Sequence, residues 1–382
     1  MTSNSPYFRL SGFYFWYFAF VGAYGPFFAL YLQDRGFDPV DIAMLMAVGP
    51  VARIFVPNVW GWLADRYRGR DLIQRALAFV TPFIAAGLLL HPGFAGLLTL
   101  LILWSVFWSG LLPLVEAGTM TVLRAHIGAY GRVRLWGSIG FIVVVVGGGY
   151  WFDAVGVGAL EWIIPALLVC TALTVFMLPR DRSERNESKG TASLRAVFAQ
   201  PGVAGLIAGF FLMQFAHGPY NTFYSIYLVE GGYTKTAIGW LWALGVVAEI
   251  ILFMWLPQLM RRWRLQQVLI ACFAFAVLRF LLIAWGLRSL PIMMFAQLLH
   301  AMTFGAFHAA GVAATHQVFG DRLRSRGQAL YSSLGYGAGG ACGTLAAGYA
   351  WAQFGGAMTF SFAAAAALLA LVLVRRSLPA FH

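Results

Sequence analysis

Residues Gly239 to Pro257 read G-W-L-W-A-L-G-V-V-A-E-I-I-L-F-M-W-L-P, an apolar run long enough to cross a lipid bilayer as one helix. A single carboxylate, Glu249, lies near the middle of this run, and the flanking charges are Lys235 and Arg261. At the helical rise, Glu249 is roughly 18–20 Å from either flank, inside the hydrocarbon. A charge at that depth costs about 2.5–3.5 kcal/mol. Because of this cost, we expect Glu249 to have a partner within the protein and a functional role.

The composition indicates a polytopic membrane protein. The chain has 382 residues, of which 60% are hydrophobic and only 10% are charged, whereas a soluble domain has about 25% charged residues. Three cysteines lie inside apolar runs and are too few for a disulfide framework. The first apolar run is too long for the core of a cleavable signal, so we expect an uncleaved first helix.

Apolar runs separated by turn residues and charges predict an all-α protein with twelve transmembrane helices. The longest piece outside the membrane is residues 179–200, which are charged and Ser-rich and therefore predict a flexible cytoplasmic linker. This linker divides the chain into an N-terminal six-helix half, residues 1–178, and a C-terminal six-helix half, residues 201–382.

The distribution of Lys and Arg predicts the orientation. With the N-terminus inside, the cytoplasmic loops and tails carry 21 of the 26 basic residues and the outer loops carry three, Arg35, Lys235 and Arg288. This bias predicts cytoplasmic N- and C-termini in the inner membrane. It also accounts for the net charge of +12 without a nucleic-acid partner. We expect a monomer in the lipid bilayer, with a small-molecule substrate, protons as a second ligand and no cofactor.

The two halves resemble distant repeats. A shift of 196 residues places Arg53 on Glu249 and residues 65–68 on residues 261–264. Six helices, a cytoplasmic linker and six further helices are typical of paired transporter halves.

Two arginines lie within the predicted spans. Arg53 is near the middle of the second span, where its planar guanidinium can bind the carboxylate of an anionic substrate through two hydrogen bonds. The alternative is a fixed Arg53–Glu249 pair that only holds the halves together. Arg279 lies near mid-depth of the ninth span and needs a partner, either Glu249 or a histidine of the tenth span. For Arg279 we favour a structural ion pair over substrate contact.

Glu116 in the fourth span and Arg134 at the start of the fifth lie near the cytoplasmic edge. We predict either a pair across neighbouring helices at the floor of a substrate cavity, or two side chains that reach separately to water.

The seventh span carries Gln214, His217, Asn221 and Tyr224 at spacings of three and four, which place them on one helical face. Such a face indicates the wall of a wet substrate cavity, and Pro219 would open the backbone ladder locally. The alternative is interhelical hydrogen bonding that only stabilises the bundle.

His300 and His308 lie two turns apart in the tenth span. Histidine titrates near neutral pH and suits proton relay, although a lone histidine is more often a satisfied polar group. We predict a proton-coupling role for at least one of them. No metal site is expected, because no further ligand has a convincing spacing.

The first span is aromatic, and Tyr17 and Tyr24 are seven residues apart. They either line a cavity for an aromatic ligand or belong to an interfacial aromatic belt.

The exit of the second span carries a motif, Gly61-Trp-Leu-Ala-Asp65-Arg66-Tyr-Arg-Gly69-Arg70. It resembles the loop 2–3 signature of the major facilitator superfamily, with one extra residue before Gly69. The resemblance implies that Asp65 pairs with basic groups across the interface of the halves, as a conformational latch in a gating loop.

More specific stretches resemble the 3-phenylpropionate permease group, within the lactose-permease-like branch. The resemblance implies a proton-coupled symporter for a small aromatic acid and spans essentially the whole chain. The stretches are Val51-Ala-Arg53, Tyr130-Gly-Arg-Val-Arg-Leu-Trp-Gly-Ser138, Gly245-Val-Val-Ala-Glu249, and Leu299-His300 with Thr303, Phe304 and His308.

In the lactose permease type, a helix-4 glutamate pairs with an arginine that opens helix 5, and Glu116 and Arg134 occupy these places. The glutamate of helix 8, the arginine of helix 9 and the histidine of helix 10 correspond to Glu249, Arg279 and either His300 or His308. The tenth span lacks the further carboxylate of those permeases, which makes Glu249 the predicted proton carrier, assisted by a histidine.

The predicted function is proton-coupled uptake of a small organic acid, such as the aromatic carboxylate 3-phenylpropionate, by alternating access. The alternatives are a sugar or nucleoside proton symporter and a drug-efflux antiporter. An intramembrane enzyme or sensor is disfavoured, because no soluble domain exceeds the linker and no nucleophile constellation is evident.

Overall fold

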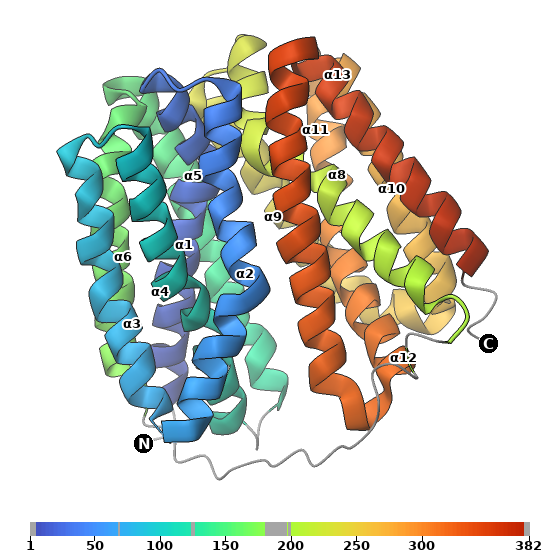
Figure 1. Ribbon diagram of the computed structural model, residues 1–382, viewed down its shortest axis with the longest axis horizontal. Helices are drawn as coiled ribbons and strands as arrows, with labels where there is room; N and C mark the ends of the chain where they lie inside the picture. The colour runs from blue at the N-terminus through green and yellow to red at the C-terminus, as the bar shows by residue number, and fades with distance from the viewer. Residues whose placement is uncertain (1–4, 68, 124–126, 180–196, 198–199, 378–382) are drawn as a thin grey trace. The chain divides into compact units, whose positions relative to one another are not determined.

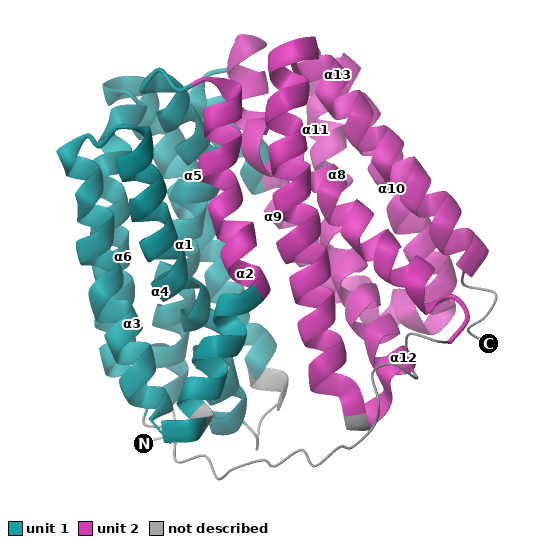
Figure 2. Ribbon diagram, in the orientation of Figure 1, with its two compact units in different colours: residues 1–37, 55–186, 233–243 teal, residues 38–54, 187–232, 244–382 magenta. Residues whose placement is uncertain are grey.

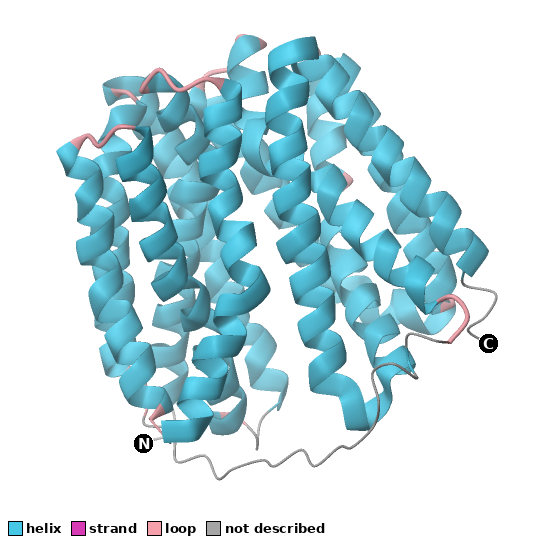
Figure 3. Cartoon of the chain, in the orientation of Figure 1, coloured by secondary structure: helices cyan, strands magenta, loops and turns pink. Residues whose placement is uncertain are grey.

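The computed structural model describes residues 5–67, 69–123, 127–179, 197 and 200–377, without the side chains of residues 5, 65, 127–129 and 322. Helices account for nearly all of these residues, and the described part of the chain contains no strand (Figures 1 and 3). Segments η1 and η2 are 3-10 helices, and η3 and η4 are π-helices. The elements are α1 (Ser5–Asp34), α2 (Pro39–Tyr67), α3 (Arg70–Ala85), η1 (Ala86–Leu90), α4 (Phe94–Val122), α5 (Ile127–Val155), η2 (Val157–Ala159), α6 (Leu160–Met177), α8 (Val203–Glu230), α9 (Lys235–Arg262), α10 (Leu265–Gly286), α11 (Leu290–Leu298), η3 (Ala301–Ala306), α12 (Phe307–Leu330), η4 (Tyr331–Gly339) and α13 (Gly340–Ser377).

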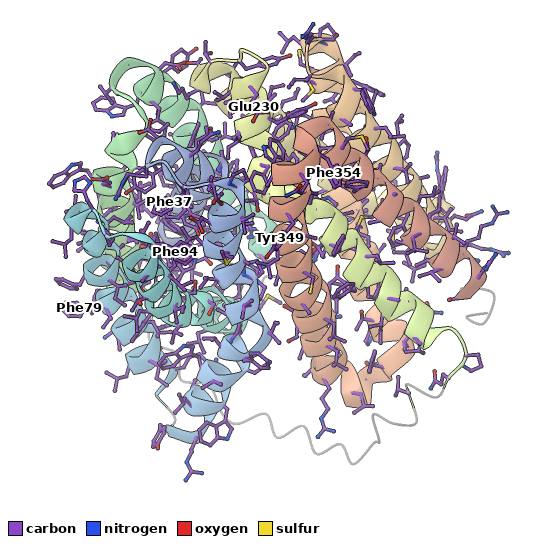
Figure 4. All side chains as sticks on the ribbon, turned by 45° about the horizontal axis from the view of Figure 1, so that its top comes forward. Phe37, Phe79, Phe94, Glu230, Tyr349 and Phe354 are labelled. Carbon is purple, nitrogen blue, oxygen red and sulfur yellow. The ribbon has the colours of Figure 1, made fainter. Side chains whose placement is uncertain are left out.

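The predicted all-α membrane fold is confirmed. Within the described residues, 10 helical segments are long and apolar enough to cross a membrane. One of them, Leu323–Ser377, has 55 residues and turns at Gly355, whose φ of 73° lies in the left-handed region that glycine adopts readily. Dividing it there and adding α8 gives the twelve predicted spans. Bulky apolar side chains face outward, for example Phe79 on α3 (Figure 4).

The chain forms two compact units, shown in different colours in Figure 2. Unit 1 comprises residues 1–37, 55–186 and 233–243, and unit 2 comprises residues 38–54, 187–232 and 244–382. Each unit therefore includes a short segment from the opposite half of the sequence. Most of the predicted linker lies outside the described residues, so the boundaries at residues 178 and 201 stay a prediction.

Each unit is built on a close helix crossing. In unit 1, a Cβ atom at Gly140 of α5 would collide with the backbone of Phe15 on α1. In unit 2, a Cβ atom at Gly343 of α13 would collide with the backbone of Phe215 on α8. Small residues allow this backbone approach in membranes, where packing rather than hydrophobic burial drives helix association. The partner-helix glycines, Gly22 and Gly218, are related by the same 196-residue shift, so the repeat extends to the packing.

The crossing in unit 1 gives a stability prediction. We expect Gly140→Ala to destabilise the protein by about 1–3 kcal/mol, because the added methyl group overpacks a backbone contact. Gly147→Ala is the matched control on the same helix, since a Cβ atom there meets nothing within 4 Å. Thermal unfolding in detergent measures both variants, and equal melting temperatures would contradict the packing assignment.

Each unit takes one short segment from the opposite half of the sequence, residues 233–243 in unit 1 and residues 38–54 in unit 2. Hydrogen bonds hold both segments inside their units. In unit 1, the Asp153 carboxylate of α5 accepts from the backbone N–H groups of Lys235 (2.9 Å) and Thr236 (2.8 Å) at the start of α9. A carboxylate is favourable at a helix N-terminus. In unit 2, the Ser333 hydroxyl of η4 donates to the Ile54 carbonyl of α2 at 3.0 Å. This second contact places the α2 segment that carries Arg53 beside η4.

Candidate functional site

Unit 2 contains a buried polar cluster around Arg279 of α10. Its side chain is 0% exposed, and its guanidinium lies 4.1 Å from the Tyr220 ring centroid. Nε donates to the Ala296 carbonyl (3.1 Å), Nη1 to the Thr303 hydroxyl (3.0 Å) and Nη2 to the Gln297 amide oxygen (3.5 Å). Among the described residues, no carboxylate forms a salt bridge with Arg279. Neutral acceptors and an aromatic face therefore hold it, and Glu249, the partner that the sequence suggested, interacts with it electrostatically without forming a salt bridge.

This geometry predicts that lysine cannot replace Arg279. We expect Arg279→Lys to lower the free energy of unfolding, because an ammonium lacks the planar fork and each lost charged hydrogen bond costs about 1.5–3 kcal/mol. The exposed Arg288 supplies the control, since Arg288→Lys removes no buried contact. A melting temperature for Arg279→Lys equal to that of the control would contradict the assignment.

Glu249 and His300 lie together in the same unit. The Glu249 Oε1 atom is 3.9 Å from His300 Nε2, and His300 is 8% exposed. The imidazole stacks on Phe304 at 5.2 Å between ring centroids. Gly245, one turn before Glu249, leaves room for the imidazole, because a Cβ atom there would be 3.3 Å from His300 Cδ2. The structure thus brings together two of the predicted proton-coupling residues, both able to bind a proton.

Arg53 and His308 converge on a third residue that the sequence interpretation missed, Tyr336 of η4. The Arg53 guanidinium lies 5.9 Å from the Tyr336 ring centroid, and His308 Nδ1 is 3.0 Å from the Tyr336 hydroxyl oxygen. Arg53 and His308 are both exposed. Tyr336 also interacts electrostatically with Glu249, so the group extends to the carboxylate. Arg53 therefore faces Tyr336, while Glu249 pairs with His300.

Two π-helical segments shape this region. The segment η3 carries Thr303 and Phe304, and η4 carries Ser333 and Tyr336. Single-turn π segments inside α-helices are frequent at functional sites, because the widened turn re-aims side chains. The one sequence signal for η4 is its glycine content, with Gly335, Gly337 and Gly339 among its nine residues.

The predicted polar face of α8 divides in two. Gln214, His217 and Tyr224 are buried, whereas Asn221 is exposed. His217 Nδ1 lies 2.8 Å from the Met213 carbonyl. The Nε2 atoms of Gln214 and His217 are buried and meet no hydrogen-bond partner among the described residues. Buried polar atoms without partners are rare and indicate water or ligand contact.

Unit 1 contains the predicted pair Glu116 and Arg134. Glu116 accepts a hydrogen bond from the Tyr130 hydroxyl and interacts electrostatically with Arg134. The Arg134 guanidinium lies 3.9 Å from the Phe18 ring centroid and 5.8 Å from that of Tyr14. The two predicted residues therefore share one neighbourhood, in which aromatic faces hold the arginine.

The two tyrosines of α1 belong to an aromatic cluster inside unit 1. The Tyr17 ring stacks on Trp108 with centroids 4.3 Å apart, and the Tyr24 ring stacks on Phe28 at 4.6 Å. Tyr17 is a core residue of the unit.

The predicted gating loop joins α2 to α3. Gly61 lies within α2, Gly69 precedes α3, and Arg70 is the first residue of α3. The Arg66 guanidinium lies 5.6 Å from the Trp62 ring. The side chain of Asp65 lies outside the described residues, so its role as a latch stays a prediction.

Comparison with known proteins identifies the class. Residues 7–362 match the model of the MFS_1 like family, and the chain belongs to this family. It is 31% identical over 379 residues to a probable 3-phenylpropionic acid transporter of Escherichia coli (strain K12), covering 96% of each chain. It is 24% identical to a maltose permease of Geobacillus stearothermophilus, over 88% of this chain and 86% of the permease.

The fold agrees with solved transporters. The nucleoside transporter NupG superposes with a TM-score of 0.80 at 15% identity, covering 100% of this chain and 99% of that one. The protein is therefore a multi-pass membrane transporter of the major facilitator type, and not an enzyme.

Proposed function

We propose that the protein imports a small organic acid, an aromatic carboxylate of the 3-phenylpropionate type, together with protons across the inner membrane. The observation that carries this proposal is the Glu249–His300 pair in unit 2, two proton-binding groups 3.9 Å apart within apolar spans. The relative from Escherichia coli, described as a probable 3-phenylpropionic acid transporter, supports the substrate class. The distribution of Lys and Arg supports cytoplasmic termini.

The proposed coupling follows from electrostatics in a low-dielectric site. Arg53 supplies an exposed positive charge for the substrate carboxylate. The Phe304 ring contacts both the Tyr336 ring (6.3 Å between centroids) and the His300 ring (5.2 Å), so the Arg53–Tyr336 group lies near the Glu249–His300 pair. An anion bound there adds negative charge close to Glu249 and His300, which favours their protonated forms. Proton and anion thus bind together, and the loaded site carries less net charge through the conformational change. The four residues that take part in this coupling all belong to unit 2: Arg53, Glu249, His300 and Tyr336.

Uptake into proteoliposomes tests this function. Labelled 3-phenylpropionate should accumulate when an inward proton gradient is imposed and should only equilibrate without it. Maltose and a nucleoside, offered under the same gradient, test the two neutral-substrate alternatives. Gradient-driven accumulation of a neutral substrate alone would replace the proposed substrate class, and export from loaded vesicles would indicate efflux.

A further inference from the structure

Three side chains from three separate elements meet in unit 2: Arg53 of α2, His308 of α12 and Tyr336 of η4. The Arg53 guanidinium is 5.9 Å from the Tyr336 ring centroid, and the Tyr336 hydroxyl oxygen is 3.0 Å from His308 Nδ1. Tyr336 is partly buried, while Arg53 and His308 are exposed. The group therefore combines a positive charge, a hydroxyl and a titratable ring, and none of the three side chains is fully buried.

The arrangement is fixed by the backbone rather than by the three side chains alone. The Ser333 hydroxyl donates to the Ile54 carbonyl at 3.0 Å, one residue from Arg53. Gly337, the neighbour of Tyr336, packs against Ile54, and a Cβ atom there would approach the Ile54 backbone nitrogen to 3.3 Å. The π-helical turn of η4 thus presents Tyr336 to Arg53 on one side and to His308 on the other.

The hydrogen bond between Tyr336 and His308 has two forms. When Nδ1 carries no proton, the Tyr336 hydroxyl donates to it and has no proton left for another acceptor. When Nδ1 carries a proton, in the imidazolium or in the neutral Nδ1–H tautomer, the ring donates to the hydroxyl oxygen and the hydroxyl proton is released for a third group. A bound anion and acid pH both favour the imidazolium, in which Nδ1 is always a donor. A carboxylate beside Arg53 is the acceptor best suited to that proton, because charge-assisted hydrogen bonds are about twice as strong as neutral ones.

We propose that Tyr336 is a specificity-determining residue, which binds the substrate carboxylate together with Arg53 and donates to it only when His308 Nδ1 is protonated. This inference rests on the proposed function in one respect, the organic anion as substrate. In this arrangement, protonation of His308 accompanies binding of the anion. This proton is distinct from the one bound by the Glu249–His300 pair.

The surrounding charges determine the direction of the pH dependence. From η4, Tyr331 and Tyr336 face His308, with ring centroids 5.9 Å and 5.8 Å from its own. Arg53 of α2 lies against the Tyr336 ring, Tyr336 interacts electrostatically with Glu249 of α9, and a bound anion favours a positively charged imidazole. The thiol of Cys272 on α10 lies beside Tyr331. Because the anion favours the protonated ring, anion affinity is highest at acid pH and falls as pH rises.

Binding to the purified full chain tests this inference apart from transport. Calorimetry with 3-phenylpropionate covers roughly pH 6 to 8.5, where histidine titrates and the carboxylate stays ionised. We expect the wild-type affinity to fall as pH rises. Tyr336→Phe should weaken binding about tenfold at the acid end and remove most of the pH dependence, since the ring remains for Arg53 but the donor is lost.

Two further variants and a neutral ligand complete the design. His308→Asn places an uncharged amide near Nδ1 and should make the affinity independent of pH. Tyr349→Phe is the matched control, because Tyr349 is 64% exposed on α13 (Figure 4), and it should bind like the wild type. The neutral amide of the same ligand offers only an uncharged acceptor, so its affinity should differ between Tyr336→Phe and the wild type much less than that of the carboxylate, and its binding also shows that the variant is folded.

The outcomes separate the two proposals. Wild-type affinity and pH dependence in Tyr336→Phe, with normal gradient-driven uptake, would overturn the role of Tyr336 and leave the proposed function intact. Weakened, pH-independent binding by that variant, with no proton-driven uptake by the wild type, would support the carboxylate site and overturn proton coupling. A wild-type protein that binds no 3-phenylpropionate while binding a neutral substrate would overturn both.

Discussion

Glu249→Gln is expected to abolish uphill accumulation of the substrate while leaving substrate exchange across the membrane intact. Glutamine keeps the size and hydrogen-bonding capacity of the side chain but cannot bind or release a proton. The His300 imidazole, 3.9 Å away, then faces an uncharged amide in place of a carboxylate. With a gradient of about one pH unit, each coupled proton accounts for about tenfold accumulation, and the variant should lose this factor entirely.

Parallel assays of accumulation and counterflow measure this effect. Glu230→Gln is the matched control, because Glu230 is an exposed carboxylate at the end of α8 (Figure 4) and should transport like the wild type. Full proton-driven accumulation by Glu249→Gln would refute the role of this carboxylate as the proton carrier.

Arg53→Gln should raise the substrate concentration needed for half-maximal uptake by about 10- to 100-fold. The Arg53 guanidinium is exposed beside Tyr336, so its charge is available to a substrate anion. A hydrogen bond to a charged group contributes about 1.5–3 kcal/mol, and each 1.4 kcal/mol corresponds to a factor of ten. Arg53→Lys keeps the positive charge but lacks the planar guanidinium, so its half-saturating substrate concentration should lie between those of Arg53→Gln and the wild type.

The same variant distinguishes the substrate classes. A sugar or nucleoside carries no carboxylate, so transport of either by Arg53→Gln should remain near the wild-type level. Arg288→Gln removes an exposed charge between α10 and α11 and serves as the control. An unchanged half-saturating concentration of 3-phenylpropionate in Arg53→Gln would remove the anion-binding role of Arg53.

The membrane fold could be predicted because it depends on quantities that a sequence carries directly. Apolar length predicts the spans, whereas the turn at Gly355 inside the longest helical segment is known from its backbone angles in the structure. Glu249 and Arg279 were evident for a similar reason, since a charge inside an apolar run is costly enough to indicate a partner or a function.

The contacts that define the candidate site could not be predicted in the same way. Tyr336 is unremarkable as a residue type, and its position depends on the π-helical turn of η4 and on the Ser333–Ile54 hydrogen bond between distant parts of the chain. The partners of Arg279 include the Ala296 carbonyl, a backbone group available near the junction of α11 and η3. Side-chain patterns alone indicate that a buried arginine needs acceptors, but not which acceptors it finds.

Proton entry driven by the substrate is a direct test of proton coupling. Proteoliposomes are loaded with a pH-sensitive dye, no proton gradient is imposed, and 3-phenylpropionate is added outside. We expect acidification of the lumen that is saturable, requires the protein and is absent in Glu249→Gln. Uptake of labelled substrate without any change in luminal pH would contradict proton coupling.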